Sequence, residues 1–208
     1  MGAFLNILSS FDSRTAALLV AVAFFIQASS IGAQAFLIRE YKGVGTALLG
    51  NLSMAIGFAL LLFRGSLPNF LTIIVANPLT ILGPGLYSIA LSRFLGQKYN
   101  SSFIIFFIVL NALALIYFTY IHENIGARII VVSTSAALLT FYVVNRFWRA
   151  RQAPYRFSMV LAVIPFTIYG VFLGVRAIVT YFSPPTQIFT NTPIESATYL
   201  LLFIISFL

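Results

Sequence analysis

The sequence predicts an all-α integral membrane protein, a bundle of seven transmembrane helices formed by one domain over residues 1–208. Hydrophobic residues make up 61% of the chain and charged residues only 8%, whereas soluble domains are about 25% charged. Uncharged stretches of the length that crosses a hydrocarbon core, about 20 residues, recur between short polar connections. These observations exclude a water-soluble enzyme, a disordered tail and a coiled coil.

The expected spans are the uncharged stretches, taken in chain order. They are Thr15–Ile38, Thr46–Phe63, Phe70–Ser92, Phe103–Ile121, Ile129–Asn145, Phe157–Tyr181 and Ala197–Leu208. The first six are long enough to cross a bilayer, whereas the seventh is too short at about 1.5 Å per residue. We therefore expect the chain to be cut within its seventh span, before a cytoplasmic output domain.

The connections between the spans predict both topology and orientation. Short links make sequential helices antiparallel neighbours, and basic residues accumulate in cytoplasmic loops. One side carries eight basic residues, namely Arg39, Lys42, Arg93, Lys98, Arg146, Arg149, Arg151 and Arg156. The other side carries three, namely Arg14, Arg64 and Arg128. This asymmetry predicts an external amino terminus and a cytoplasmic carboxyl terminus.

A competing interpretation makes residues 14–35 a cleaved signal peptide. The segment has one basic residue, an apolar stretch and a cleavage-like Ala33-Gln34-Ala35. Cleavage would place the basic connection Arg146–Arg156 outside, against the positive-inside rule, so we favour the uncleaved bundle.

The charged and metal-binding residue types exclude several partners. The net charge is +8, but the basic residues stand singly between apolar runs and form no stripe that tracks phosphates. We therefore expect the lipid bilayer, and not nucleic acid, as the partner. Cysteine is absent and His122 is the single histidine, so we expect no metal site and no cofactor.

Polar side chains inside the spans are the candidate ligand-binding residues. Gln27, Asn77, Asn111 and Tyr169 fall near mid-membrane on the first, third, fourth and sixth spans. Polar groups in lipid are costly and need partners, so these four can line a shared pocket. The alternative is that they hold helices together by hydrogen bonds.

Arg176 is the one charged residue inside a span and completes the candidate site. It lies near the outer end of the sixth span, where an arginine can bind a carboxylate or a lipid phosphate through two hydrogen bonds. The alternative is that it snorkels to the interface or pairs with Asp12, Glu123 or Glu195.

Prolines mark the candidate moving elements. Pro78 and Pro84 interrupt the third span and Pro165 the sixth, and each removes a helical hydrogen bond. We expect kinks at all three and a two-state element in the third span. Gly170 and Gly174 form a small-xxx-small pair, for which packing within the bundle is favoured over dimerisation.

No residue of the chain is assigned a catalytic role. The spans contain no paired carboxylates, which excludes a glycosidase or a proton-relay pump, and no lysine for a retinal Schiff base. A Ser-His-Asp arrangement would have to use His122 and Asp12 at the rim.

Several short runs resemble a family of bacterial membrane input regions. They are Tyr41-Lys42-Gly43 through Gly50-Asn51-Leu52, Gly57-Phe58-Ala59-Leu60-Leu61, Leu67-Pro68-Asn69-Phe70, Val75-Ala76-Asn77, Ser92-Arg93-Phe94-Leu95-Gly96, Val175-Arg176-Ala177 and Ser183-Pro184-Pro185. Together they resemble the amino-terminal multi-helix modules that precede diguanylate cyclase (GGDEF) domains and some histidine kinases.

The resemblance implies a sensor in the bacterial cytoplasmic (inner) membrane. Its seventh helix would continue into a cytoplasmic diguanylate cyclase, which makes cyclic di-GMP, or into a kinase. It also implies a homodimer through that helix and the downstream domain. The chain itself has no GGDEF, HAMP or kinase motif, so no enzyme activity is assigned to it.

Three functions follow from the sequence, and the first is favoured. It is a sensory input module in which a small molecule or lipid shifts the helix packing. The second is a small transporter or channel built from three-plus-three inverted repeats, with Pro78 and Pro165 as matched breaks. The third is a membrane enzyme acting on lipids, for which no acid–base pair is present.

Overall fold

The computed structural model describes residues 13–37, 42–150, 156–185 and 193–206, which form helices and connections without a β-strand element. The helices are α2 (Ser13–Leu37), α3 (Val44–Leu62), η1 (Phe70–Val75), α4 (Ala76–Phe94), α5 (Ser101–Ile116), η2 (Tyr117–Ile121), α6 (Ile125–Arg149), α7 (Arg156–Phe182) and α8 (Pro193–Ser206). The all-α prediction is confirmed for these residues.

Six of the helices are long and apolar enough to cross a membrane. They are Arg14–Leu37, Val44–Leu62, Phe70–Phe94, Ser101–Ile121, Ile125–Arg149 and Met159–Phe182. Each coincides with one of the first six expected spans. The seventh expected span corresponds to α8, which begins four residues earlier than Ala197.

The predicted bounds of the fifth span are wrong at both ends, because α6 is longer than Ile129–Asn145. The side chain of Asn124 accepts a hydrogen bond from the backbone N–H of Ala127 at 2.9 Å, which caps the helix four residues upstream. Arg128 therefore lies in the first turn of α6 instead of in a connection. At the other end, Arg146 and Arg149 belong to the last turn, where a cation is favoured by the helix dipole.

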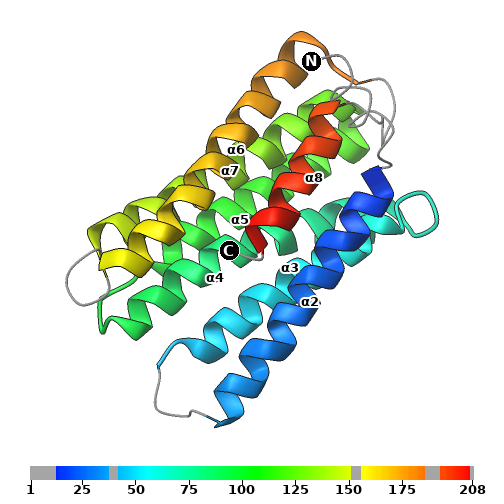
Figure 1. Ribbon diagram of the computed structural model, residues 1–208. Coiled ribbons are helices and arrows are strands. Elements are labelled where there is room, and N and C mark those ends of the chain that lie inside the picture. The colour runs from blue at the N-terminus through cyan, green and yellow to red at the C-terminus, as the bar shows by residue number, and fades with distance from the viewer. Residues whose placement is uncertain (1–12, 38–41, 151–155, 186–192, 207–208) are drawn as a thin grey trace.

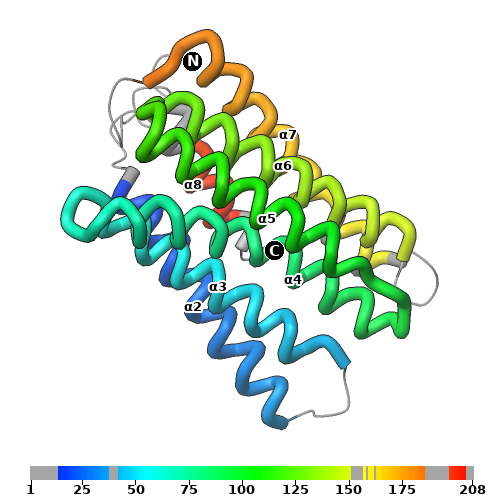
Figure 2. Tube along the Cα trace, turned by 180° about the vertical axis from the view of Figure 1, so that it is seen from behind, coloured from blue at the N-terminus to red at the C-terminus, as the bar shows by residue number. Residues whose placement is uncertain are grey.

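The bundle has two parts joined by α4. Figures 1 and 2 show α2 beside α3, and α6 beside α7, with the two pairs diverging at the end that carries the connection after Leu37. Helix α4 packs against both α3 and α6, and so links the pairs. Helix α8 packs against α2 and α7, and Figure 1 shows it in red between these elements.

The core of α2, α3 and α8 is built from stacked aromatic rings and small residues. The ring of Phe58 lies 6.1 Å from that of Phe24 in a stacked arrangement and 6.1 Å from that of Tyr199 in an edge-on arrangement. Ala16, Ala17 and neighbouring apolar side chains of α2 complete this buried cluster. Aromatic pairs in such geometries are stabilising beyond their buried area, so α8 is held to the bundle by its own core contacts.

Close approach of α3 and α4 depends on glycines. A Cβ added to Gly57 would lie 2.8 Å from Cγ2 of Thr80 and 3.0 Å from the carbonyl oxygen of Ala76. A Cβ added to Gly83 would collide with Met54. Small residues let helix backbones approach in this way.

The prolines of the third span lie at different structural positions. The π-helical η1 runs directly into α4, where Pro78 is the third residue. The side-chain amide of Asn77 donates to the carbonyl of Ile73 at 2.8 Å. This carbonyl therefore has a donor even though Pro78, which has no N–H, cannot supply one. Pro84 and Pro165 lie inside α4 and α7, whose helical ranges continue past them.

Gly170 and Gly174 differ in how closely other side chains pack against them. Gly170 is packed against α6, because a Cβ there would meet the Phe141 ring at 3.2 Å and Cγ2 of Thr140 at 3.4 Å. Nothing lies within 4 Å of a Cβ on Gly174. Packing within the bundle therefore accounts for Gly170.

Candidate functional site: an arginine-lined cavity

A cavity between α3, α4, α6, α7 and α8 contains the candidate functional site. Its volume is about 90 Å³. Its lining consists of Met54, Phe58, Leu61, Arg64, Asn77, Thr80, Pro84, Leu115, Ile125, Arg128, Ile129, Val132, Ala136, Tyr169, Leu173, Arg176, Thr198, Tyr199 and Leu202. Three arginines from distant parts of the chain thus line one cavity.

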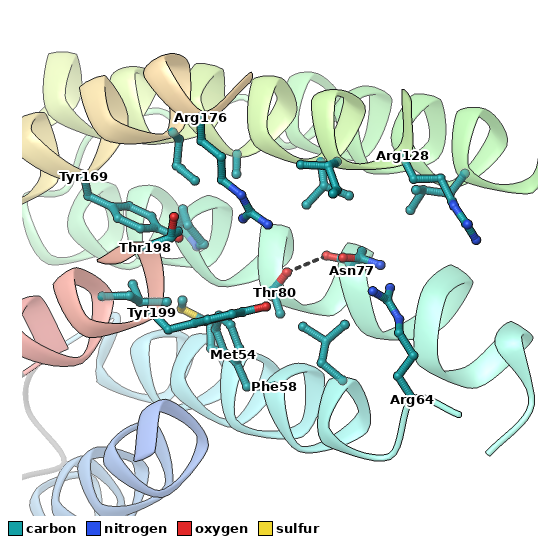
Figure 3. A pocket seen from close by; sticks show the side chains of 18 of the residues that line it. Met54, Phe58, Arg64, Asn77, Thr80, Arg128, Tyr169, Arg176, Thr198 and Tyr199 are labelled. Carbon is teal, nitrogen blue, oxygen red and sulfur yellow. Dashed lines mark hydrogen bonds between the residues drawn. The ribbon is translucent and has the colours of Figure 1, made fainter. Parts of the chain in front are cut away.

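Each arginine is positioned by a different element. Arg64 lies in the turn that follows α3, Arg128 in the first turn of α6, and Arg176 in the second half of α7. Figure 3 shows Arg176 descending from α7 toward the middle of the cavity and Arg64 rising from the turn toward Asn77, while Arg128 extends from α6 at the end of the cavity beyond Asn77. We call these residues the arginine cluster.

Arg128 is the most buried member of the arginine cluster. Its side chain is 7% exposed, and its Nη2 atom is buried without a hydrogen-bond partner among the residues that the structure describes. The first turn of α6 contains no acidic residue, and the positive end of the helix dipole disfavours a cation there. A buried guanidinium with an unpaired N–H is costly, so this geometry favours the binding of an anion.

Among the residues that the structure describes, the lining of the cavity includes no carboxylate. Glu123 acts electrostatically on Arg128, but it is exposed and lies outside the lining. The other expected partners of Arg176, the side chains of Asp12 and Glu195, lie outside the described part of the chain.

The rest of the lining is mostly apolar with a few neutral hydrogen-bonding groups. The hydroxyl of Thr80 donates to the backbone carbonyl of Asn77 at 2.8 Å. Tyr169 of α7 and Thr198 and Tyr199 of α8 approach from the other side (Figure 3). Such a lining suits a ligand with one charged end and one apolar end.

A second cavity lies toward the diverging ends of the helices. It is lined mainly by apolar side chains of α2, α3, α4, α6 and α7, with Gln27, Lys42 and Asn51 as its amide and charged groups. The two cavities share four lining residues: Met54, Pro84, Tyr169 and Leu202. The two cavities therefore adjoin at these four side chains, which we call the partition.

The structure separates the five expected site residues into three places. Asn77, Tyr169 and Arg176 line the arginine-lined cavity, whereas Gln27 and Tyr169 line the second one. Asn111 lines neither. Its amide donates to Oγ of Ser135 at 3.1 Å and to the carbonyl of Val131 at 3.4 Å, which is the helix-joining role that the sequence left open.

The expected switch prolines also differ in position. Pro84 lines both cavities, and Pro78 and Pro165 line neither. Because proline has no N–H, Pro84 makes no helical hydrogen bond to the carbonyl of Thr80. Of the three prolines, Pro84 is therefore the one that both lacks this helical hydrogen bond and belongs to the partition.

Sequence reasoning did not identify Arg64 and Arg128 as site residues, because it counted both as loop charges. The capping residue Asn124 is the signal that would have placed Arg128 on a helix. The inward direction of Arg64 has no comparable local signal, because it depends on the turn after α3 facing α6.

The fold and the cavity define a helical bundle with six membrane-length helices and a cationic, partly apolar cavity at one end. Among the described residues, no group of three or more histidine, aspartate and glutamate residues could hold a metal ion. No protein-family model matches the chain, and comparisons with curated proteins and with solved structures found no match.

Proposed function

We propose that this chain is the seven-helix input module of a bacterial signalling protein in the cytoplasmic membrane. Its amino terminus is outside, and α8 runs inward toward a cytoplasmic diguanylate cyclase or kinase. A ligand in the arginine-lined cavity changes the packing of α8, and the dimeric output domain responds to that change. The orientation rests on the eight-to-three distribution of basic residues.

The observation that carries this proposal is the position of α8. Its residues Thr198, Tyr199 and Leu202 line the arginine-lined cavity, and Leu202 also lines the second cavity. The same helix packs on α2 and α7. An occupant of the cavity would thus touch the last helix of the chain directly, and a ligand shifts an equilibrium only through such differential contacts.

Helix movement provides the first test. The chain has no cysteine, so spin labels can be attached at Ile204→Cys on α8 and Leu138→Cys on α6, both at exposed positions. We expect ligand to change the distance between these labels by about 1–2 Å, the usual size of a helix shift. The control pair Leu113→Cys and Leu138→Cys, on α5 and α6, should not change. Equal behaviour of the two pairs contradicts the proposal.

The polarity of the bundle provides the second test. Ser66 and Lys98 are exposed residues at opposite ends of the bundle. In intact cells, a membrane-impermeant maleimide should label Ser66→Cys and not Lys98→Cys. The reverse pattern would place the carboxyl end of α8 on the outer side of the membrane. It could not then act on a cytoplasmic output domain.

A small transporter is the second candidate, and the partition favours it. Two cavities that meet at Met54, Pro84, Tyr169 and Leu202 would suit alternating access. Liposomes containing residues 1–208 distinguish the two functions, because an input module conducts no solute. The coding sequence after codon 208 distinguishes them as well. An in-frame cyclase or kinase domain is expected for the input module, and a stop codon soon after α8 for the transporter.

A further inference from the structure

We infer that the arginine-lined cavity binds an organic oxyanion, with its carboxylate or phosphate on the arginine cluster and its apolar part toward the partition. This inference names the ligand class of the proposed input module, and only its biological meaning rests on that function. The binding itself follows from the cavity.

The charge of the cavity selects an anion. The arginine cluster brings three cations to a lining whose described residues include no carboxylate. Nη2 of Arg128 keeps an unused N–H in a side chain that is 7% exposed. A guanidinium that donates two parallel hydrogen bonds is well matched to a carboxylate or phosphate, and the burial of Arg128 strengthens the attraction.

The position of the charges within the cavity selects an amphiphilic anion. Arg64 and Arg128 gather at one side of the cavity, whereas Tyr169, Tyr199 and Met54 lie at the other, and Arg176 projects between them (Figure 3). An inorganic anion would leave this apolar side empty. An aromatic or short aliphatic group attached to the anion would bury its surface there.

Purified chain 1–208 and four small probes test the inference by titration calorimetry. The probes are benzoate, phenyl phosphate, benzamide as the uncharged match of benzoate, and inorganic phosphate as the headgroup alone. We expect benzoate or phenyl phosphate to bind at least about 10-fold more tightly than benzamide and than inorganic phosphate. Equal binding of benzoate and benzamide would overturn the charge selection. Equal binding of phenyl phosphate and inorganic phosphate would overturn the apolar subsite.

Substitutions locate the binding to the arginine cluster. Arg128→Gln and Arg176→Gln should each weaken anion binding roughly 10- to 100-fold, the range expected for charge-assisted hydrogen bonds. Arg14→Gln is the matched control, because Arg14 is exposed at the same end of the bundle and lines neither cavity. A loss of affinity as large in the control, or none in the two cluster variants, would contradict the assignment.

A conservative variant separates recognition from folding. Arg128→Lys keeps the positive charge but removes the planar donor pair, so affinity should fall less than in Arg128→Gln while added salt still weakens binding. If Arg128→Gln does not fold, Arg176→Gln and Arg128→Lys carry the test. Native affinity in both would overturn the inference.

A final comparison identifies the source of the anion. Benzoate is titrated into the chain in lipid-free detergent and in nanodiscs of phosphatidylglycerol. Competition by phosphatidylglycerol assigns the site to a lipid headgroup, and unchanged binding assigns it to a free anion.

The outcomes for the ligand and for the signalling role are distinguishable. Anion binding that leaves the distance between Ile204→Cys and Leu138→Cys unchanged retains the anion site and removes the input function. Movement of α8 under another stimulus, without anion binding, retains the input function and removes the anion site.

Discussion

The two ends of the bundle use arginine in opposite ways. At one end, Nη2 of Arg146 donates to Oγ of Ser92 at 2.6 Å and to the carbonyl of Lys98 at 2.9 Å. There too, Nη1 of Arg93 donates to Oγ1 of Thr46 at 2.8 Å. At the other end, the more deeply buried Arg128 has an Nη2 without a hydrogen-bond partner among the described residues. Arg146 thus has its partners in the protein, whereas Arg128 lacks one for Nη2.

The difference separates a structural arginine from a candidate ligand-binding one. An arginine whose donors are satisfied stabilises the fold, and its loss leaves its acceptors unpaired. A buried arginine without sufficient partners destabilises the fold until an anion arrives. The sign of the stability change on substitution therefore tests the comparison.

The largest expected effect is at Arg146. Arg146→Gln removes two charge-assisted hydrogen bonds, one of them to the fully buried Ser92, and should lower the free energy of unfolding by about 2–3 kcal/mol. The midpoint of thermal unfolding in detergent, followed by circular dichroism, measures this loss. Unchanged stability would mean that the arginines at the two ends of the bundle do not differ in how they contribute to the stability of the fold.

The next effect has the opposite sign. Without ligand, Arg128→Gln should leave the free energy of unfolding unchanged or raise it by about 1 kcal/mol, because a buried uncompensated charge is removed. The same thermal measurement with benzoate present should then show no ligand-induced rise. A clear destabilisation without ligand would assign Arg128 to the structural class.

Loss of the helix cap above Arg128 should have a smaller effect. Asn124→Ala removes the bond from the N–H of Ala127 and should cost about 1 kcal/mol. Because the cap sets where α6 begins, anion affinity should fall as well. Asn100→Ala removes the corresponding cap of α5 and serves as the control, with a similar cost and unchanged affinity.

The smallest expected effect is at Asn111. Its amide joins α5 to α6, but its Oδ1 atom has no hydrogen-bond partner in the described chain. Asn111→Leu should therefore change the free energy of unfolding by about 0.6 kcal/mol or less, the typical value of such bonds within a bundle. Anion binding should be unaffected, because Asn111 lines neither cavity; a large loss of affinity would contradict its placement.

The helices could be predicted from the sequence because the length and hydropathy of each apolar segment are properties of that segment alone. Hydropathy over about 20 residues located the first six spans, such as Phe70–Ser92 within the observed Phe70–Phe94. Helix ends were predicted less well, because charge was taken as the boundary. Arg128 and Arg146 are both charged and helical, and the side-chain cap at Asn124 is what places Arg128 inside the helix.

The candidate site was predicted in part. Polarity and depth pointed to Asn77, Tyr169 and Arg176, which share one cavity, and also to Asn111, which does not. Depth along a helix follows from residue number, whereas the direction in which a side chain faces depends on how the helix is rotated against its neighbours.

Composition and hydropathy alone determined that this chain is helical and where six membrane-length helices run, since each helix satisfies its own backbone hydrogen bonds. Packing in three dimensions decided that Arg64, Arg128 and Arg176 line one cavity, and that α8 also lines it. The reason is physical. The placement of these side chains depends on contacts between residues far apart in the sequence, such as those of α4 with α6 and of α2 with α8, and no local pattern encodes them.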